Sequence, residues 1–251
     1  MTTVDLERAL RDAGLAAPAR WLEVTGSTNA AAMAMADEGA PEWTLVGAGH
    51  QTRGRGRLGR TWHDRAGGSL MTSIVLRPPL APADAGILTL LAGAAWAEAA
   101  SEVAALPVRC RWPNDLMLGD DKLGGILAEA SVAADGSVRH VVIGSGVNLS
   151  PPTEADGAAG LGGDVDATVL LTAFLRALRT GYRPGDTRFA DGVTTRWRNV
   201  SATLGRTVRA TRVDGVAVEG RATDVDAGGS LLVETDAGLQ TVTFGDLHHL
   251  D

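Results

Sequence analysis

The chain has 251 residues, of which 45% are hydrophobic, enough for one large domain with a buried core or for a large and a small domain. Its 30 acidic side chains outnumber the 23 basic ones, and the net charge of -7 disfavours general binding to nucleic-acid backbones. The only cysteine, Cys110, cannot close an intramolecular disulfide, which suits a reducing compartment, so we expect a cytoplasmic protein. The acidic start of the chain and its interrupted apolar runs predict neither a secretory signal nor a membrane span.

The first part of the chain predicts alternating helices and strands. Apolar residues at helical spacing predict a short helix over residues 4–15, and Ser27 or Thr28 can cap an alanine-rich helix over residues 29–38. Apolar runs between Gly, Asp and Pro predict strands at residues 43–48, 70–76, 108–111, 126–132 and 138–147, with a helix at residues 82–105 between them. The segment before Trp21 is too short for a DNA-binding headpiece, so we expect no repressor function.

The last third of the chain predicts one more helix and a small β domain. Asp166 can cap a helix that carries an apolar stripe and ends near Gly181. Residues 151–163, rich in Pro, Gly, Ala and Asp, are the predicted flexible loop. Short alternating runs follow, divided by turn signals, at residues 208–213, 216–222, 230–235 and 239–244. We therefore predict an α+β body followed by a small C-terminal β-barrel.

Residues 50–62 are the most informative stretch, a basic loop between two predicted strands. The loop concentrates arginines and glycines, namely Arg53, Gly54, Arg55, Gly56, Arg57, Gly59 and Arg60. Glycine lets backbone amides approach an anion, and guanidinium groups donate forked hydrogen bonds to phosphate or carboxylate oxygens. The loop therefore predicts an anion site, with a solvated basic loop or a nucleic-acid contact as the alternative. Leu58 and Trp62 favour a loop that folds over a ligand.

Three further segments place polar residues beside predicted strands. Asn114 and Asp115 follow a strand and a proline, a position where binding sites are commonly built. Lys122 begins the next strand, with two glycines behind it that leave space for a ligand. Residues 144–149 end another strand at Asn148. Singly, these features are typical of a turn, an exposed charge and a bulge, and only their combination predicts a site.

Five segments resemble, in order and spacing, the motifs of biotin protein ligases. They are Ser27-Thr28-Asn29, GRGRLGRTW at residues 54–62, RWPNDL at 111–116, KLGGILAE at 122–129 and GSGVNL at 144–149. The resemblance is strong over residues 21–149 and looser towards the C-terminus. It implies a catalytic domain with a mixed β-sheet and flanking helices at residues 1–203, related to class II aminoacyl-tRNA synthetases and lipoate ligases. It also implies an SH3-like β-barrel at residues 204–251.

The resemblance implies roles for individual residues as well. The biotin site would comprise Ser27, Thr28, Asn29, Gln51, Gly54, Arg55, Arg57, Lys122, Gly124, Gly125 and Leu127. The ATP site would comprise Arg57, Arg60, Trp62, Arg111, Asn114, Lys122 and Asn148. As catalytic groups, Lys122 and Arg57 would act on the reacting carboxylate and phosphate, and Asp115 would orient the acceptor amine, accept its proton, or only hold Lys122.

Two positions depart from the family pattern. Arg111 stands where the family commonly has lysine, and a planar guanidinium does not copy the geometry of an ammonium point charge. Leu58 replaces a residue that is often basic. Mg²⁺ would arrive with the triphosphate, with no protein side chain assigned as its ligand. We expect His248 and His249 to be ordinary surface residues, and one cysteine with five histidines predicts no transition-metal site.

The activity that the resemblance implies is that of an ATP-dependent ligase. It would activate biotin to biotinyl-5'-AMP with release of pyrophosphate, and then transfer biotin to a lysine of a biotin carboxyl carrier protein domain. We expect no nucleic-acid or membrane partner, and a monomer or weak homodimer. A lipoate or octanoyl ligase is the alternative enzyme. A nucleotide- or RNA-binding module that uses the basic loop without chemistry is the alternative from another class.

Overall fold

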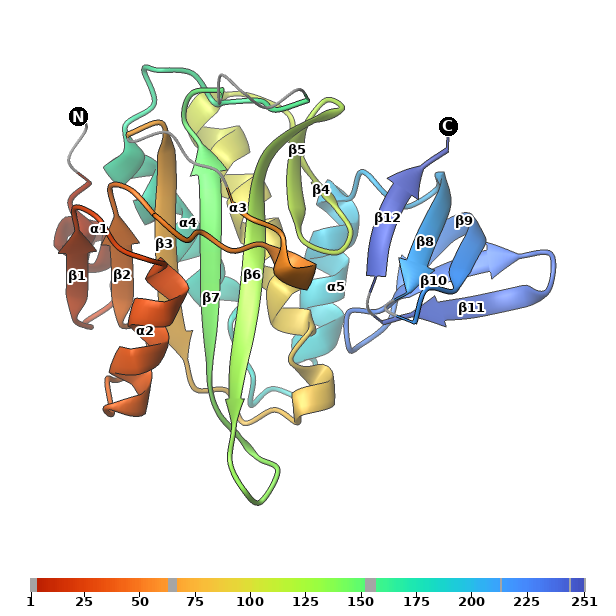
Figure 1. Ribbon diagram of the computed structural model, residues 1–251, viewed down its shortest axis with the longest axis horizontal. Coiled ribbons are helices and arrows are strands. Elements are labelled where there is room, and N and C mark those ends of the chain that lie inside the picture. The colour runs from red at the N-terminus through yellow and green to blue at the C-terminus, as the bar shows by residue number, and fades with distance from the viewer. Residues whose placement is uncertain (1–3, 63–66, 152–156, 213, 244, 251) are drawn as a thin grey trace.

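The larger part of the molecule is a seven-stranded sheet in the order β1-β2-β3-β7-β6-β5-β4 (Figure 1). The computed structural model describes residues 4–62, 67–151, 157–212, 214–243 and 245–250. The strands are β1 Ala19–Leu22, β2 Leu45–Ala48, β3 Ser69–Leu76, β4 Val108–Arg111, β5 Asp115–Leu118, β6 Asp121–Val132 and β7 Val138–Asn148. Strands β1 and β2 pair in parallel and all other neighbours are antiparallel, so the sheet is mixed.

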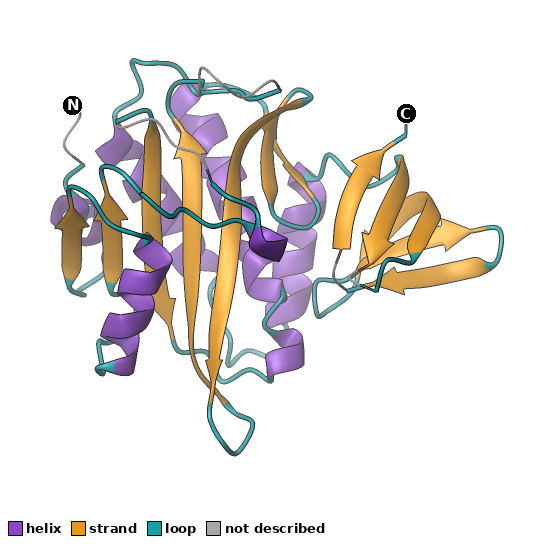
Figure 2. Cartoon of the chain, in the orientation of Figure 1, coloured by secondary structure: helices purple, strands orange, loops and turns teal. Residues whose placement is uncertain are grey.

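Helices cover both faces of this sheet (Figure 2). The α-helices are α1 Leu6–Asp12, α2 Thr28–Asp37, α3 Ile87–Ala104, α4 Ala167–Gly181 and α5 Phe189–Val200, with short 3-10 turns η1 Arg57–Gly59 and η2 Pro82–Asp84. On one face, α3 packs between the sheet and the pair α4 and α5, and α1 packs on α4. On the other face, α2 packs Ala32 and Ala36 against Val46, Val75 and Val142.

Local sequence signals explain where several helices begin and which faces they bury. The side chains of Asp5 and Asp166 accept hydrogen bonds from the first free amides of α1 and α4. Helix α3 is apolar on all sides, and its Trp96 stacks on Phe174 of α4 with ring centroids 3.9 Å apart. Residues Pro82–Ala104 are long and apolar enough to cross a membrane, but 67% of the most apolar window is buried inside the protein. This segment is therefore a core helix, as its all-round apolar surface requires.

The C-terminal part is a second, five-stranded antiparallel sheet in the order β11-β10-β9-β8-β12. Its strands are β8 Thr207–Arg212, β9 Ala217–Val225, β10 Leu231–Thr235, β11 Gly238–Val242 and β12 Gly245–His249. The predicted barrel is not confirmed, because no ladder joins the edge strands β11 and β12 among the described residues. Two predicted strand ends, Val213 and Phe244, lie outside those residues.

The C-terminal sheet is docked on the body through tight contacts. Trp112, which is buried, donates from its indole nitrogen to the Gly229 carbonyl at 3.0 Å, and its backbone amide donates to Thr203 Oγ1 at 2.9 Å. A Cβ atom on Gly86, just before α3, would lie 2.7 Å from the Gly228 carbonyl oxygen. The turn between β9 and β10 therefore packs directly on the body beside the β4–β5 turn.

The predicted loop at residues 151–163 is anchored where it is described. Residues 152–156 lie outside the described part of the chain. Beyond them, two backbone hydrogen bonds join this segment to Lys122. The Lys122 amide donates to the Gly157 carbonyl at 2.8 Å, and the Ala159 amide donates to the Lys122 carbonyl at 2.9 Å. The segment thus fixes the backbone at the start of β6, where a site residue was predicted.

Candidate functional site

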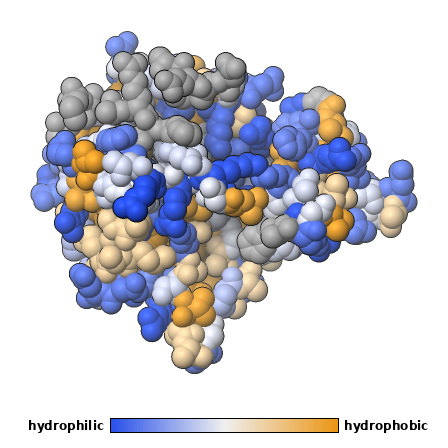
Figure 3. All heavy atoms as spheres, in the orientation of Figure 1, coloured by the Kyte–Doolittle hydropathy of each residue, from blue (hydrophilic) through white to orange (hydrophobic). Residues whose placement is uncertain are grey.

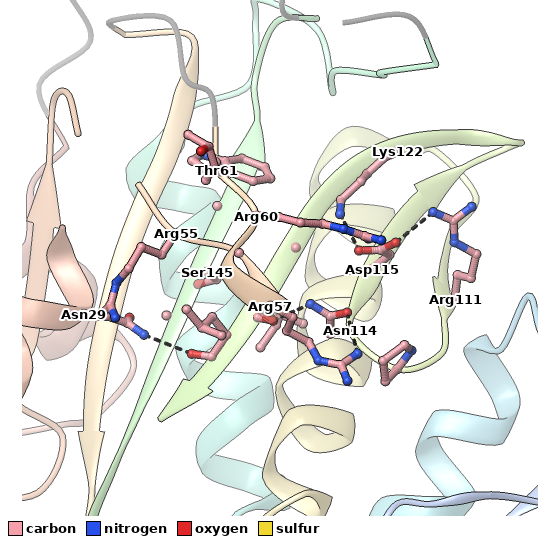
Figure 4. A pocket seen from close by; sticks show the side chains of 18 of the residues that line it. Asn29, Arg55, Arg57, Arg60, Thr61, Arg111, Asn114, Asp115, Lys122 and Ser145 are labelled. Carbon is pink, nitrogen blue, oxygen red and sulfur yellow. Dashed lines mark hydrogen bonds and ion pairs between the residues drawn. The ribbon is translucent and has the colours of Figure 1, made fainter. Parts of the chain in front are cut away.

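A cavity of about 410 Å³ opens on the sheet face that carries α2, between the basic loop and β12 (Figure 4). Its walls come from the start of α2, the loop, the β4–β5 turn, the middle of β6 and β7, and β12. Most of the predicted site residues line it, namely Ser27, Thr28, Asn29, Gln51, Arg55, Arg57, Arg60, Trp62, Arg111, Asn114, Asp115, Lys122, Gly125 and Leu127. Segments more than 90 residues apart in the sequence therefore meet at one place.

Glycines on β6 and β7 make the floor of this cavity. Gly125 pairs with Gly146 across the two strands, and Gly144 and Gly146 lie on the same face because they are two residues apart. A Cβ atom on Gly144 would lie 1.9 Å from Asn29 Oδ1, and one on Gly146 would lie 2.6 Å from the indole ring of Trp62. Both positions must be glycine for these two side chains to lie on the sheet. The missing side chains also leave the space that a ligand needs.

One end of the cavity is buried, polar and uncharged. Gln51 Oε1 accepts hydrogen bonds from the Thr28 amide at 2.7 Å and from Thr28 Oγ1 at 3.1 Å. The Ser73 hydroxyl lies 2.8 Å from Thr28 Oγ1 and 2.6 Å from Asn29 Oδ1, and both Ser73 and Asn29 are buried. Because these groups hold one another in place, this end offers fixed donors and acceptors to a neutral polar ring.

The other end of the cavity gathers cations around one carboxylate. Asp115 lies between Lys122 and Arg111, with Lys122 Nζ 2.5 Å from Oδ1 and Arg111 Nη2 2.8 Å from Oδ2 (Figure 4). Arg57 Nη1 donates to Asn114 Oδ1 at 3.4 Å, and Asn114 is itself fixed by bonds to the backbone of Ile126. Arg57 and Lys122 therefore face the same cavity.

The charge state of Arg57 reflects this environment. Burial lowers the pKa of the Arg57 guanidinium, while the carboxylates of Asp246 and Asp115 raise it in part. A guanidinium keeps its proton at neutral pH, so a positive charge sits partly out of water. Hydrophilic side chains gather across the middle of this face of the molecule, where the loop crosses the sheet (Figure 3). A partly desolvated cation interacts more strongly with a bound anion than an exposed one does.

The C-terminal sheet contributes to the cavity, which the sequence did not predict. Asp246, Leu247 and His248 of β12 line it. Arg60 Nη2 of the loop pairs with Asp246 Oδ2 at 2.5 Å. His248 is exposed, as expected of a surface residue, but its surface faces the site. No sequence signal distinguishes β12 from the other alternating strands, so only the docking of the two sheets identifies these residues.

Two predicted glycines support the cavity without lining it. A Cβ atom on Gly54 would lie 2.7 Å from the carbonyl oxygen of Trp62, and one on Gly124 would lie 2.5 Å from that of Gly146. Both are therefore positions where two backbones approach closely. Gly54 closes the base of the basic loop, where the Trp62 amide donates to its carbonyl at 3.0 Å, and Gly124 lets β6 approach β7.

Asn148 also lies outside the cavity lining, in contrast to the nucleotide contact expected of it. Its side chain is buried, donates to the Ala159 carbonyl at 3.1 Å and accepts from Ser69 Oγ at 3.0 Å. Asn148 thus ties the end of β7 to the segment that holds the Lys122 backbone. The side chain of Ser145, which the sequence left unassigned, lines the cavity instead, 3.3 Å from Thr72 Oγ1.

The mixed sheet, the appended C-terminal sheet and this cavity define a ligase of the biotin and lipoate class. The model of the biotin/lipoate A/B protein ligase family matches residues 21–148, and that of the biotin protein ligase C-terminal domain matches residues 203–249. The chain belongs to the biotin/lipoate A/B protein ligase family.

Several individual proteins of this family are similar to the chain over most of its length. The chain is 33% identical to the biotin--[acetyl-CoA-carboxylase] ligase of Mycobacterium tuberculosis, over 97% of this chain and 95% of that protein. It is 32% identical to the bifunctional ligase/repressor BirA of Bacillus subtilis, over 90% of this chain and 72% of that protein. The solved structure of the Aquifex aeolicus biotin protein ligase in complex with biotin and ATP has the same fold, with a TM-score of 0.73 at 24% identity, covering 92% of this chain and 99% of that one.

Proposed function

We infer that this chain is a biotin protein ligase, which activates biotin with ATP to biotinyl-5'-AMP, releases pyrophosphate, and transfers biotin to a lysine of a biotin carboxyl carrier protein domain. One observation carries this inference beyond the family: a single cavity joins a buried, uncharged polar end to a group of cations. Biotin has the same division, with a neutral polar ring at one end and a carboxylate at the other. The ring would bind between Thr28 and Gln51, and the carboxylate would lie towards Arg57 and Lys122.

Adenylation requires the cavity to bring two anions together. The biotin carboxylate attacks the α-phosphate, so the site must neutralise both groups and the charge that develops between them. Arg57 and Lys122 line the cavity from different elements, the loop and β6, and a reacting centre close to both would have its charge neutralised by two cations. Arg60, Arg111, Trp62 and Asn114 would hold the rest of the nucleotide. Trp62 offers a buried indole N–H with no partner among the described residues.

Lys122 and Asp115 would change partners during the reaction. Their ion pair of 2.5 Å holds the ammonium group at the cavity wall. A bound carboxylate or phosphate competes for Lys122, which loosens this pair and leaves Asp115 to Arg111. In the second step the acceptor lysine must lose a proton before it attacks the acyl carbon. Asp115 would orient this amine or accept its proton, and holding Lys122 is the alternative role.

The basic loop would protect the intermediate. Biotinyl-5'-AMP is a mixed anhydride that water hydrolyses, so the site must exclude water until the acceptor arrives. Residues 53–62 cross the cavity and contribute Arg55, Arg57, Arg60 and Trp62 to it. The loop is tied at its base by the Trp62 amide and at its tip by the Gly56 amide, which donates to the Arg60 carbonyl at 2.7 Å. Such a loop can close as a unit.

Mg²⁺ would accompany the triphosphate and reduce its charge. Among the described residues no three His, Cys, Asp or Glu side chains form a cluster that could hold a metal ion. Mg²⁺ commonly keeps several waters and binds substrate phosphates, so we propose an ion carried by the nucleotide. We further propose that the enzyme acts in the cytoplasm, on a carrier domain and without nucleic-acid or membrane partners, as a monomer or weak homodimer.

The test is to incubate the chain with biotin, ATP and a biotin carboxyl carrier domain and to blot with streptavidin. We expect ATP-dependent labelling of the carrier. Lys122 is the only lysine of the chain, so the enzyme offers few amines of its own to released intermediate and contributes little background. A parallel reaction with lipoate and a lipoyl carrier domain tests the alternative enzyme. Labelling of the lipoyl domain alone would overturn the proposed substrate, and labelling of neither carrier would overturn the function.

A further inference from the structure

Glu129, at the end of the fourth quoted motif, has no role in the site described so far, but it joins two parts of that site. It lies on β6, and 27% of its side chain is exposed. Its Oε2 accepts a hydrogen bond from Asn29 Nδ2 at 2.7 Å and one from Arg55 Nη2 at 3.1 Å. Asn29 belongs to α2 and Arg55 to the basic loop. One carboxylate therefore links the loop to the polar end of the cavity.

The link continues through the buried polar groups and returns to the loop. From Glu129, polar contacts run through Asn29, Ser73 and Thr28 to Gln51. Asn29 Nδ2 donates to Glu129 at 2.7 Å, the Ser73 hydroxyl lies 2.6 Å from Asn29 Oδ1 and 2.8 Å from Thr28 Oγ1, and the Thr28 amide donates to Gln51 Oε1 at 2.7 Å. Gln51 stands at the start of the loop that contains Arg55. The chain of hydrogen bonds therefore begins and ends in the loop and passes through the groups proposed to bind the biotin ring. Hydrogen bonds in such a network polarise and fix one another.

Apart from Trp62, which packs on the sheet, the loop does not fill the space between itself and β6. A second hollow of about 340 Å³ separates them, lined by Arg55, Leu58, Leu127 and Glu129 among others. Leu58, which could have packed into this hollow, is 55% exposed. Its φ of 54° is the left-handed conformation, which a non-glycine residue adopts at a cost. The Arg55–Glu129 pair is therefore the polar tie that spans the hollow.

We propose that Glu129 is a positioning residue that couples occupation of the biotin-ring site to closure of the basic loop. This proposal rests on the proposed function. A ring bound between Thr28 and Gln51 stabilises the network, which keeps Asn29 directed at Glu129 and Glu129 at Arg55. Arg55 then holds the loop over the ligand. Glu129 touches neither ligand nor reacting atoms in this scheme, and it acts through Arg55 and Asn29.

The test compares Glu129→Gln with Glu98→Gln in biotin-dependent ATP–pyrophosphate exchange. Glutamine keeps an oxygen for Asn29 but loses the charge that pairs with Arg55. Glu98 is the matched control, because it also pairs with an arginine, Arg196, yet joins α3 to α5 away from the cavity. We expect the KM for biotin to rise about tenfold in Glu129→Gln, a moderate effect because Arg55 is half-exposed. The KM for ATP should stay within about twofold, and Glu98→Gln should match the wild type in both.

Two further measurements separate positioning from general loosening of the fold. With biotin bound, trypsin should cleave the loop of Glu129→Gln faster than that of either the wild type or Glu98→Gln. Arg55→Gln combined with Glu129→Gln should raise the KM for biotin no more than the worse single variant, because both remove the same link. An unchanged KM for biotin, or equal rises in the two KM values, would overturn the proposal. Absence of biotin-dependent exchange in the wild type would instead overturn the proposed function.

Discussion

Asp115 neutralises two cations of the site at once, Lys122 and Arg111, and its side chain is 15% exposed. Arg111 is one of the two positions that depart from the family pattern, and its guanidinium pairs with Asp115. This arrangement explains why arginine can stand there: a single 2.8 Å contact to one carboxylate oxygen does not require the shape of an ammonium group. Both cations share this carboxylate, so a substrate anion that attracts Lys122 leaves Asp115 paired with Arg111.

At this scale the sharpest prediction concerns Lys122. Lys122→Ala should lower biotin-dependent ATP–pyrophosphate exchange about 100-fold to 1,000-fold, because a preorganised charge at the reacting centre is removed. The control is Arg109→Ala, a cation on β4, two strands away in the sheet, whose side chain donates to the Asn199 carbonyl at 3.2 Å and does not line the cavity. Exchange by Lys122→Ala near the wild-type rate would contradict the role given to this residue.

Asp115 itself can be tested by separating the two partial reactions. Asp115→Asn should still form biotinyl-5'-AMP but should transfer biotin to the carrier about 100-fold more slowly, because an amide cannot accept the proton of the acceptor amine. Single-turnover transfer from preformed intermediate measures the second step alone. Asp12→Asn is the control, since Asp12 pairs with Arg8 at 3.5 Å on α1, away from the cavity. Equal losses in both steps would show that Asp115 only holds Lys122.

The basic loop contributes several residues to the cavity, but its ion pairs with the rest of the protein are exposed. It is a short hairpin with a 3-10 turn at its tip and an isolated bridge between Arg55 and Thr61. In its ion pairs, Arg55 with Glu129 and Arg60 with Asp246, half or more of each arginine side chain is exposed. Exposed pairs stabilise weakly, so the loop should open readily until a ligand adds further contacts.

This mobility predicts ligand-dependent protection from trypsin at the arginines of the loop. Biotin plus ATP should slow cleavage after Arg55 and Arg57 at least about tenfold, a shift of about 1.4 kcal/mol in the opening equilibrium. Mass spectrometry of the early fragments identifies the bonds that are cut. Cleavage after Arg109, which lies outside the site, provides the internal reference. An identical cleavage rate in saturating ligand would reject the loop as a lid.

At the scale of the whole molecule, the two sheets form one site. Trp112 lies in the motif that also carries Asn114 and Asp115, and its indole bonds to the turn between β9 and β10. The Arg198–Asp224 pair and the Arg60–Asp246 pair span the same junction. The C-terminal sheet therefore helps to set the β4–β5 turn, and β12 completes the wall of the cavity.

Trp112→Phe should consequently weaken the junction. It removes the donor of a partly buried hydrogen bond to the Gly229 carbonyl, so the free energy of unfolding should fall about 1 kcal/mol further than in Trp96→Phe. Trp96 is the matched control, since its indole nitrogen is buried without a partner among the described residues. Urea unfolding of the three proteins gives the comparison. Equal stability of the two variants would show that the bond does not secure the C-terminal sheet.

Predictions from the sequence were most accurate where the local signal is strong. The cap and apolar stripe of α4, the extent of α2, and the runs of β3, β4 and β7 lie within a few residues of their predictions, although Ser27 makes no side-chain hydrogen bond at the start of α2. Helix α5 was missed, because it contains Gly192 and β-branched residues that favour a helix weakly. It is stabilised by burying Phe189, Val193 and Trp197. The short strands β1, β5 and β12 were also missed.

The sequence by itself determined the chemistry of this protein: which guanidinium, ammonium and amide groups are present, and where glycines clear space beside them. Only the tertiary structure decided which of these groups meet. Asn148 and Gly124 became supports of the cavity, whereas Glu129 and Asp246 became contacts of the loop. The reason is that strand order and the docking of one sheet on another depend on contacts between residues far apart in the chain, and motif spacing does not encode them.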